Sequence, residues 1–272
     1  MTAPLVSCLM VTRDRARLAA RALRCLAAQT WPRLELVVVD DGDEDYEPVL
    51  APLRARMAVR YVRRAVDPAL RLGGLRNLAL DLAGGDLCAQ WDDDEWYHPD
   101  RIAAQVRALQ ARDAIACVLK WTLMHVDTQE LGGLPYRADA GHGTPGTIIH
   151  RRTAVRYPNL SRSEDARFLD ALRERGHVEV MGKDASHLFI RCFHGANTWD
   201  ERHFYRRLRR TPRGALHWLV AWLKGDLSSH PQLQLTDVEQ RSVAEFLADS
   251  RALELLRWRA RPRPEEARPS PS

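Results

Sequence analysis

Short apolar runs alternate with segments of helical periodicity through the first 110 residues of the chain. An apolar run over 5–11 is followed by 15–28, where Leu18, Ala22 and Leu26 recur at helical spacing. The run over 34–39 is nearly continuous and ends in three valines, which indicates a strand covered on both faces, as parallel sheets require. The same reasoning predicts helices over 49–56, 75–83 and from Pro99 onward, and strands over 58–63 and 87–91. This alternation predicts an α/β fold with a mostly parallel sheet flanked by helices.

The second half of the chain has a less regular pattern. We expect one or two strands over 114–126, a Gly/Pro-rich loop over 132–146, a strand at 148–149, a helix over 163–175, and extended segments over 177–181 and 188–193. From residue 203 the pattern becomes helical, over 204–224 and 237–258, with many Arg, Leu and Trp residues. Residues 261–272 are rich in Pro, Arg and Ser and are predicted to be disordered. We therefore expect an α/β domain over 1–200, a helical extension over 201–260 and a disordered tail.

Composition narrows the class of protein. The chain has 272 residues, 45% of them apolar, and 41 Lys+Arg against 36 Asp+Glu, a net charge of +5 that does not demand nucleic acid. Its five cysteines are widely spaced, without metal-ligand spacing, which favours a reducing compartment. We find no secretory pattern and no uncharged stretch of the ~20 residues that span a bilayer. This predicts a soluble cytoplasmic protein, with contact to the cytoplasmic face of a membrane left open.

Two acidic clusters follow predicted strands. Asp40-Asp41 comes after one strand and the run from Asp92 to Glu95 after another, at the strand ends where ligands bind in open α/β sheets. Four adjacent acids repel one another unless a cation is present, and Mg²⁺ or Mn²⁺ binds carboxylates while keeping substrate phosphates as further ligands. The alternative is a solvated acidic turn before a helix whose dipole it suits. The aromatic residues on both sides, Trp91 and Trp96-Tyr97, favour a site.

These clusters belong to an ordered set of motifs. The set comprises 5–7, 11–15, 28–32, 35–42, 74–77, 85–86 and 91–95. In this order they resemble the family 2 glycosyltransferases, which have the GT-A fold, over roughly residues 4–200. The resemblance implies an inverting transfer of a sugar from a nucleotide-diphosphate donor, with UDP favoured, to an acceptor hydroxyl, and a dependence on Mn²⁺ or Mg²⁺.

The resemblance also assigns residues to the donor. Thr12, Arg13 and Arg76 would face the nucleotide, and Asp41 would accept a hydrogen bond from the base. Arg13-Asp14 stands where the family has Tyr-Asn, and Asp43 where it has Ser, so the identity of the base stays open.

The Asp-x-Asp motif of the family corresponds to Asp92 and Asp94, which are the candidate metal ligands, with Asp93 near the ribose or the sugar. His194, in the segment 193–199, is a further candidate ligand or a contact of the leaving phosphate. A lone histidine is more often a structural hydrogen-bonding residue, and that alternative stays open.

The catalytic base is expected in the segment 161–165. An inverting transfer needs a group that takes the proton of the acceptor hydroxyl, and the resemblance places it at Asp165, supported by Glu164. The structural alternative is a helix start in which Ser163 is the N-cap and the acids stabilise the first turn.

The acceptor is not defined by the sequence, and neither are the donor sugar and the oligomeric state. A glycan, a lipid-linked sugar, a peptide and a small molecule all stay open, and the loop over 132–146 is either an acceptor lid or a tolerated surface loop. The basic, Trp-rich segment 206–223 is expected to pack on the domain or on a second subunit in preference to lying on anionic lipid. Rival functions are a degenerate nucleotide-sugar-binding scaffold and a sugar nucleotidyltransferase, although the loop 11–15 lacks the glycines that the latter uses to hold a triphosphate.

Overall fold

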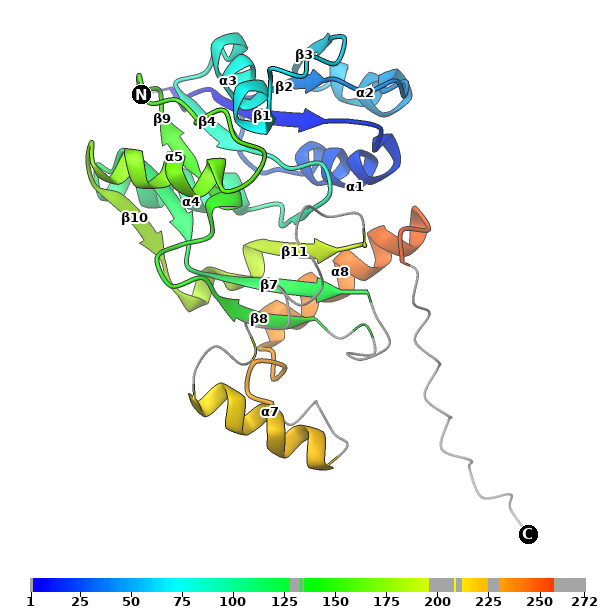
Figure 1. Cartoon of the computed structure of the whole chain (residues 1–272), viewed down its shortest axis with the longest axis vertical. Coiled ribbons are helices and arrows are strands. Elements are labelled where there is room, and N and C mark those ends of the chain that lie inside the picture. Colours follow the sequence, from blue (N-terminus) through cyan, green and yellow to red (C-terminus); the bar gives the residue numbers. More distant parts are fainter. Residues whose placement is uncertain are drawn as a thin grey trace.

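The computed structural model describes residues 2–127, 133, 135–195, 208, 212–224 and 230–256, and places the strands in two sheets (Figure 1). The larger sheet has seven strands in the order β10-β6-β9-β4-β1-β2-β3. Its strands are β1 (Val6–Thr12), β2 (Leu34–Asp40), β3 (Ala58–Arg63), β4 (Leu87–Gln90), β6 (Ala116–Leu119), β9 (Ile149–Arg151) and β10 (Val178–Met181). Only β9 runs antiparallel to its neighbours, β4 and β6. The expected mostly parallel sheet is therefore confirmed.

Helices cover both faces of this sheet. They are α1 (Ala16–Ala27), α2 (Glu47–Arg54), α3 (Leu72–Leu82), α4 (Arg101–Ala111) and α5 (Glu164–Arg173). Alternate residues of β1 and β2 serve opposite faces, because successive side chains of a strand point to opposite sides. Cys8 and Leu36 pack with α1, α2 and α4, whereas Leu9 and Val37 pack with α3 and α5.

A smaller sheet of four strands, in the order β5-β11-β7-β8, lies beside the large one (Figure 1). Its strands are β5 (Trp96–Tyr97), β7 (Trp121–Val126), β8 (Tyr136–Asp139) and β11 (Phe189–Phe193). The expected loop over 132–146 is wrong in part, because β8 lies inside it and pairs with β7. Strand β5 was not expected, and it is two residues long. Two short 3-10 helices, η1 (Pro145–Thr147) and η2 (Lys183–Leu188), complete this part of the chain.

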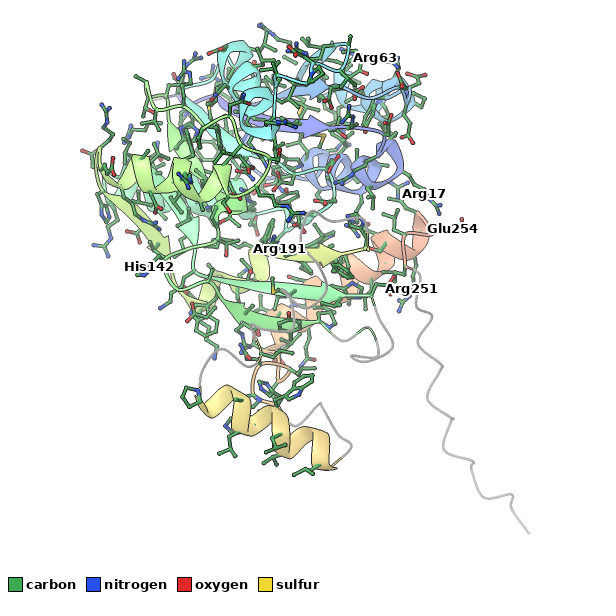
Figure 2. All side chains as sticks on the ribbon, viewed as in Figure 1. Arg17, Arg63, His142, Arg191, Arg251 and Glu254 are labelled. Carbon is green, nitrogen blue, oxygen red and sulfur yellow. The ribbon has the colours of Figure 1, made fainter. Side chains whose placement is uncertain are left out.

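Helix α8 (Asp237–Ala252) packs against the α/β core although it comes late in the sequence. Phe246 is fully buried in the main apolar cluster, and Asp249 accepts a 3.0 Å hydrogen bond from the indole of Trp96. Beyond the helix, Arg17 of α1 donates to the carbonyl of Glu254 at 2.8 Å, and the two residues lie together in Figure 2. Elements that were expected to form an extension thus cover the same core.

The predicted C-terminal boundaries can be compared only in part. Helix α7 (Pro212–Lys224) lies within the helix expected over 204–224, and 204–207 and 209–211 lie outside the described residues. The predicted tail and Trp258 also lie outside them, and the division at residue 200 stays a prediction. All five cysteines are buried, as expected of small apolar side chains. In the described part of the chain, no helix is long and apolar enough to cross a membrane.

Candidate active site

Two adjoining pockets lie where β1, β2 and β4 end and where α5 begins. The first pocket is lined by Val11, Thr12, Arg13, Arg15, Asp41, Leu70, Arg71, Leu72, Leu75, Asp93 and Ser161. The acidic pocket is lined by Val11, Arg15, Leu72, Arg76, Asp92, Asp93, Asp94, Glu95, Ser161, Arg162, Ser163, Glu164, Asp165 and Arg191. Because five residues line both, the two pockets form one continuous crevice. All predicted donor and catalytic residues line it, and the predicted ligand His194 contacts its wall at Asp94.

In the first pocket, the turn after β2 separates two adjacent acids. Asp40 is fully buried and accepts hydrogen bonds from the Gly42 amide at 2.8 Å and the Tyr61 hydroxyl at 2.7 Å, so it holds the turn. Asp41 is directed into the pocket, where Arg13 Nε lies 3.7 Å from its carboxylate. The predicted base-binding acid and its neighbouring arginine are thus brought together.

Asp14, one of the departures from the family pattern, ties the first loop to this turn. It adopts a left-handed conformation with φ of 48°, and its carboxylate accepts the amides of Asp43 at 2.6 Å and Glu44 at 3.2 Å. These hydrogen bonds lower the pKa of Asp14. A side chain at Gly42 would place its Cβ 2.6 Å from the Asp14 amide nitrogen, so only glycine fits this close approach.

Aromatic residues fix the backbone of the acidic turn after β4. The ring of Trp91 stacks on that of Tyr97 with 3.9 Å between centroids, and both are buried. The Tyr97 hydroxyl lies 2.6 Å from the Asp92 amide nitrogen. Arg101 covers both rings and donates to the Gln90 carbonyl at 3.1 Å. The sequence 91–97 therefore folds into a rigid support for its own acids.

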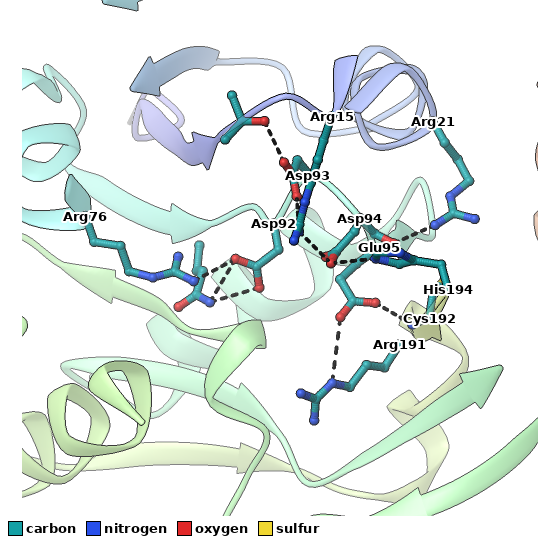
Figure 3. A network of polar contacts seen from close by, with 12 residues as sticks. Arg15, Arg21, Arg76, Asp92, Asp93, Asp94, Glu95, Arg191, Cys192 and His194 are labelled. Carbon is teal, nitrogen blue, oxygen red and sulfur yellow. Dashed lines mark hydrogen bonds and ion pairs between the residues drawn. The ribbon is translucent and has the colours of Figure 1, made fainter. Parts of the chain in front are cut away.

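The four acids of the turn have different sets of partners, and Asp93 and Asp94 share Arg15, whose Nη1 lies 3.7 Å and 3.3 Å from their carboxylates (Figure 3). The carboxylate of Asp92 accepts from Arg76 Nη2 at 2.9 Å and from Gln90 Nε2 at 3.0 Å. Asp93 accepts from the Thr12 hydroxyl at 2.5 Å. Burial and the neighbouring charge of Asp94 raise the pKa of Asp93 to about 7. Because Thr12 comes from β1, this contact joins the first strand to the acidic turn.

Asp94 is directed toward the far wall of the crevice. Its Oδ2 lies 3.1 Å from His194 Nε2 and 3.3 Å from Arg15 Nη1. Burial would raise the pKa of Asp94, but the hydrogen bond to His194 and the charges of Arg15 and Arg21 hold it below its usual range. Among the predicted metal ligands, Asp94 and His194 are therefore adjacent, while Asp92 is held by other residues.

Glu95 and Arg191 close the crevice on the side of the small sheet. Glu95 accepts the Cys192 amide at 2.6 Å, and its carboxylate lies 3.8 Å from Arg191 Nε. Burial and the charge of Asp94 raise the pKa of Glu95 well above its usual value. Sequence reasoning did not give Arg191 a role, and no local motif marks it. Arg15, by contrast, lies in the motif 11–15 but was given no role from the sequence.

The segment 161–165 begins helix α5, with Glu164 and Asp165 in its first turn. Ser163 stands at the N-cap position with a φ of 61°, but its hydroxyl accepts no capping hydrogen bond, so the side-chain cap of the structural alternative is absent. Glu164 is buried and accepts from Arg76 Nε at 3.2 Å. Asp165 is partly exposed and lines the acidic pocket. The two adjacent acids therefore differ in environment, one paired in the interior and one facing the crevice.

Arg76 links these regions, because it bridges Asp92 and Glu164. It lines the acidic pocket and is absent from the lining of the first pocket, so its guanidinium lies beside acids and not at the base end. Two glycines permit this approach of α3. A Cβ at Gly73 would lie 1.8 Å from the Pro158 carbonyl oxygen, and one at Gly74 would lie 2.8 Å from the Asn159 side chain.

Carboxyl groups outnumber guanidinium groups in the lining of the acidic pocket. Six carboxyl groups line it, those of Asp92 through Glu95 with Glu164 and Asp165, against the four guanidinium groups of Arg15, Arg76, Arg162 and Arg191. Within the described residues, no three His, Cys, Asp or Glu side chains converge as a preformed metal site.

Comparison with known proteins confirms the resemblance. Residues 7–130 match the family model described as glycosyl transferase family 2. The chain is 30% identical over 118 residues to the putative glycosyltransferase EpsH of Bacillus subtilis, covering 43% of this chain and 34% of that one. It is 30% identical over 100 residues to the putative colanic acid biosynthesis glycosyl transferase WcaA of Escherichia coli, covering 37% and 36%. The matched segment thus spans about a third of these curated relatives.

Solved structures extend the likeness over most of the chain. TarS 1-349 of S. aureus, in complex with UDP-GlcNAc, is 16% identical with a TM-score of 0.57, covering 91% of this chain and 73% of that chain. Mannosyltransferase PcManGT from Pyrobaculum calidifontis, in complex with GDP-Man and Mn²⁺, is 19% identical with a TM-score of 0.56, covering 93% and 76%. These likenesses confirm the expected fold class, a mostly parallel GT-A sheet flanked by helices.

Proposed function

We propose that this chain, which carries a family 2 glycosyltransferase domain matched over residues 7–130, transfers a sugar from a nucleotide-diphosphate donor to an acceptor hydroxyl with inversion. The observation that carries the proposal is the continuity of the two pockets. A crevice with a base-binding acid at one end and a solvent-facing carboxylate at the other matches a donor lying along it with its sugar beside the acceptor.

The nucleoside occupies the first pocket in this proposal. Asp41 accepts an N–H of the base, and Arg13, 3.7 Å from Asp41, lies beside the same edge. A carboxylate acceptor next to a guanidinium donor suits a base edge that offers an N–H and a carbonyl together, as uracil and guanine both do. We favour a UDP-sugar on the family resemblance, with a GDP-sugar as the alternative, since the TarS complex holds UDP-GlcNAc and the PcManGT complex holds GDP-Man.

The diphosphate lies where the pockets meet, at Arg15 and Asp93. A lining with more carboxyl than guanidinium groups favours a dianion poorly unless a cation accompanies it. Asp94 and His194 supply an oxygen and a nitrogen donor 3.1 Å apart, which fits Mn²⁺ or Mg²⁺ completed by phosphate oxygens. The carboxylate oxygens of Asp92 are engaged by Arg76 and Gln90, so we assign the ligand role to the other two. A bound cation would neutralise charge on the leaving diphosphate.

Asp165 takes the proton of the acceptor hydroxyl. It is the partly exposed member of its pair and faces the acidic pocket, whereas Glu164 is held by Arg76. A base must reach the attacking hydroxyl, and a buried, ion-paired carboxylate is poorly placed to do so. Glu164 instead positions the first turn of α5 through Arg76.

Calorimetric titration tests the donor site. UDP, GDP, CDP and dTDP, each with and without Mn²⁺, are titrated against the full chain and against Asp94→Ala. We expect one nucleotide to bind in a Mn²⁺-dependent manner and the variant to lose the metal-dependent part. If no nucleotide binds under either condition, the donor site is wrong.

Release of the nucleoside diphosphate from a nucleotide sugar tests catalysis without knowledge of the acceptor, because water can act as a slow acceptor. A chain that binds the nucleotide but never turns over the nucleotide sugar, with any acceptor class supplied, would instead be a degenerate nucleotide-sugar-binding scaffold. We expect turnover, because both Asp94 and Asp165 line the crevice.

A further inference from the structure

Helix α7 carries a stripe of apolar side chains that the rest of the described molecule does not cover. Of the eight large apolar residues that are exposed in the described part of the chain, four lie on this helix. They are Leu216, Leu219, Val220 and Leu223, exposed by 60%, 50%, 38% and 69%. Their spacing puts them on one helical face. We call these four residues the α7 stripe. Scattered single exposed residues are ordinary, whereas a contiguous apolar face marks an interaction surface.

The opposite face of α7 is already packed. Trp218 lies against the small apolar cluster of Met124, Val126, Tyr136, Ala138 and Leu208. His230 Nε2 is 3.4 Å from the Gly214 carbonyl oxygen. The helix lies at the end of the molecule beyond β8, away from the large sheet (Figure 1). Since α7 packs on the domain through its opposite face, the α7 stripe is not the face that the helix uses to pack on the domain.

The sequence around α7 has an unusual charge. Residues 202–224 contain seven Lys and Arg residues and no Asp or Glu. Without these seven, the chain would have 34 basic residues against 36 acidic ones, so the net positive charge of the protein comes from this segment. Two of the seven, Arg213 and Lys224, are residues of α7 itself. An apolar stripe within a strongly basic segment matches a surface that is both apolar and anionic.

We propose that the α7 stripe docks on the surface of an anionic phospholipid bilayer. A second copy of the chain fits less well, because both copies carry the same excess of cations in the sequence next to and within α7. The helix has 13 residues, fewer than the ~20 needed to span a bilayer, so it lies in the interface with leucines among the acyl chains. The proposal does not depend on the sugar-transfer reaction.

Co-sedimentation of the full chain with vesicles tests this surface. We expect binding to vesicles of phosphatidylglycerol and phosphatidylcholine, weakened by salt, and at least tenfold weaker binding to phosphatidylcholine alone. The double variant Leu219→Glu/Leu223→Glu should lower partitioning to the anionic vesicles by about tenfold or more. Val180→Glu is the matched control, since Val180 is 36% exposed on the edge strand β10. It should bind like the wild type.

Two further measurements separate the alternatives. The thermal unfolding midpoint and the far-UV circular dichroism of the double variant should match those of the wild type, which shows that the chain is folded and that lost vesicle binding is local. Sedimentation velocity in the absence of lipid should give the same species for both. The proposal is overturned if the wild type does not bind anionic vesicles or if the double variant binds them equally well. It is also overturned if the wild type is a dimer and the double variant is a monomer.

Discussion

The turns after β2 and β4 both place adjacent acids at the end of a buried strand, but they use them differently. After β2, Asp40 accepts hydrogen bonds that stabilise the turn itself, and Asp41 faces the crevice. After β4, all four acids line the acidic pocket and all four are engaged by other residues, but Asp94, held by Arg15 and His194, is the one that lies beside a second candidate ligand. The acidic run after β4 is longer than that after β2, but it does not provide a larger set of adjacent candidate metal ligands.

The difference follows from burial. Adjacent carboxylates in a low-dielectric site repel one another, so each one needs its own cation or hydrogen-bond donor. Arg76 and Gln90 serve Asp92, Thr12 serves Asp93, and Arg191 with the Cys192 amide serves Glu95. The pair at the start of α5 shows the same division, with Glu164 paired inside and Asp165 facing outward. In each group, some acids maintain the framework and one is available to a ligand.

The largest expected effect is that of removing the available acid of the longer turn. Asp94→Ala should lower Mn²⁺-dependent turnover of the nucleotide sugar by about 1,000-fold or more, because charge on the leaving group loses its support. Initial rates across a Mn²⁺ series measure it. Asp170→Ala, an exposed acid on α5, is the control and should keep normal rates. Retained metal-dependent turnover in Asp94→Ala would show that the division of roles within this turn is wrong.

The pair at the start of α5 gives the next effect. Asp165→Asn should lower kcat by roughly 100- to 10,000-fold through loss of the base, with the Kd of the nucleotide unchanged. Glu164→Gln should instead lower the thermal midpoint, because it leaves one side of buried Arg76 without its charged partner. Rates and calorimetric Kd values for the two variants decide between the roles. A larger loss of kcat in Glu164→Gln would reverse the assignment.

A buried, paired acid outside the crevice tests whether acids of this kind affect stability alone. Glu239 of α8 is buried with Arg137 and Ser186. Burial would raise the pKa of Glu239, but the hydrogen bonds from Arg137 and Ser186 lower it to about 2. Glu239→Gln should lower the free energy of unfolding by about 2 kcal/mol at pH 7.

The pH dependence of this effect has a definite sign. Because the folded-state pKa of Glu239 is below its ordinary value of 4.5, its contribution is complete above that pH and declines as the pH falls toward 2. Urea unfolding at pH 7, 5 and 3.5 should show the difference between wild type and Glu239→Gln narrowing at the lowest pH. A constant difference would mean that the ionised carboxylate is not what stabilises α8.

The smallest effect is expected in the shorter turn. Asp41→Asn should weaken nucleotide binding by about tenfold, since the base loses a charged acceptor, and should leave the thermal midpoint unchanged. Asp40→Asn should mainly affect stability. It should lower the thermal midpoint, because the turn loses its hydrogen bonds from Gly42 and Tyr61. Calorimetry and thermal unfolding of both variants measure this. Equal losses of binding and stability in the two would abolish the distinction.

Local pattern in the sequence was sufficient for the framework of the large sheet. Strands β1, β2 and β4 are largely apolar runs, β3 is a short β-branched and aromatic segment with two arginines, and each helix between them has its own periodicity, so the order of elements follows from residues close together in the chain. The acids at the ends of β2 and β4 meet for the same reason, because parallel strands bring their carboxyl ends to one edge.

Tertiary structure decided what those acids do. Residues 136–139 form strand β8 because they pair with β7. Trp96 and Tyr97 form β5 because they pair with β11. The hydroxyl of Ser163 accepts no capping hydrogen bond even though its residue type favours one. Arg76 meets Asp92 and Glu164 only after α3 packs beside the segment 158–165, where glycines allow contact.

The sequence by itself determined that the acids after β2 and β4 and at the start of α5 would lie in the crevice, because strand ends and motifs are local properties of the chain. Only the folded structure decided which partners each acid has, and that Arg191 and Phe246 belong to the site wall and the core. The physical reason is that burial and charge pairing depend on neighbours that are distant in sequence, such as Glu95 with β11 and α8 with α1.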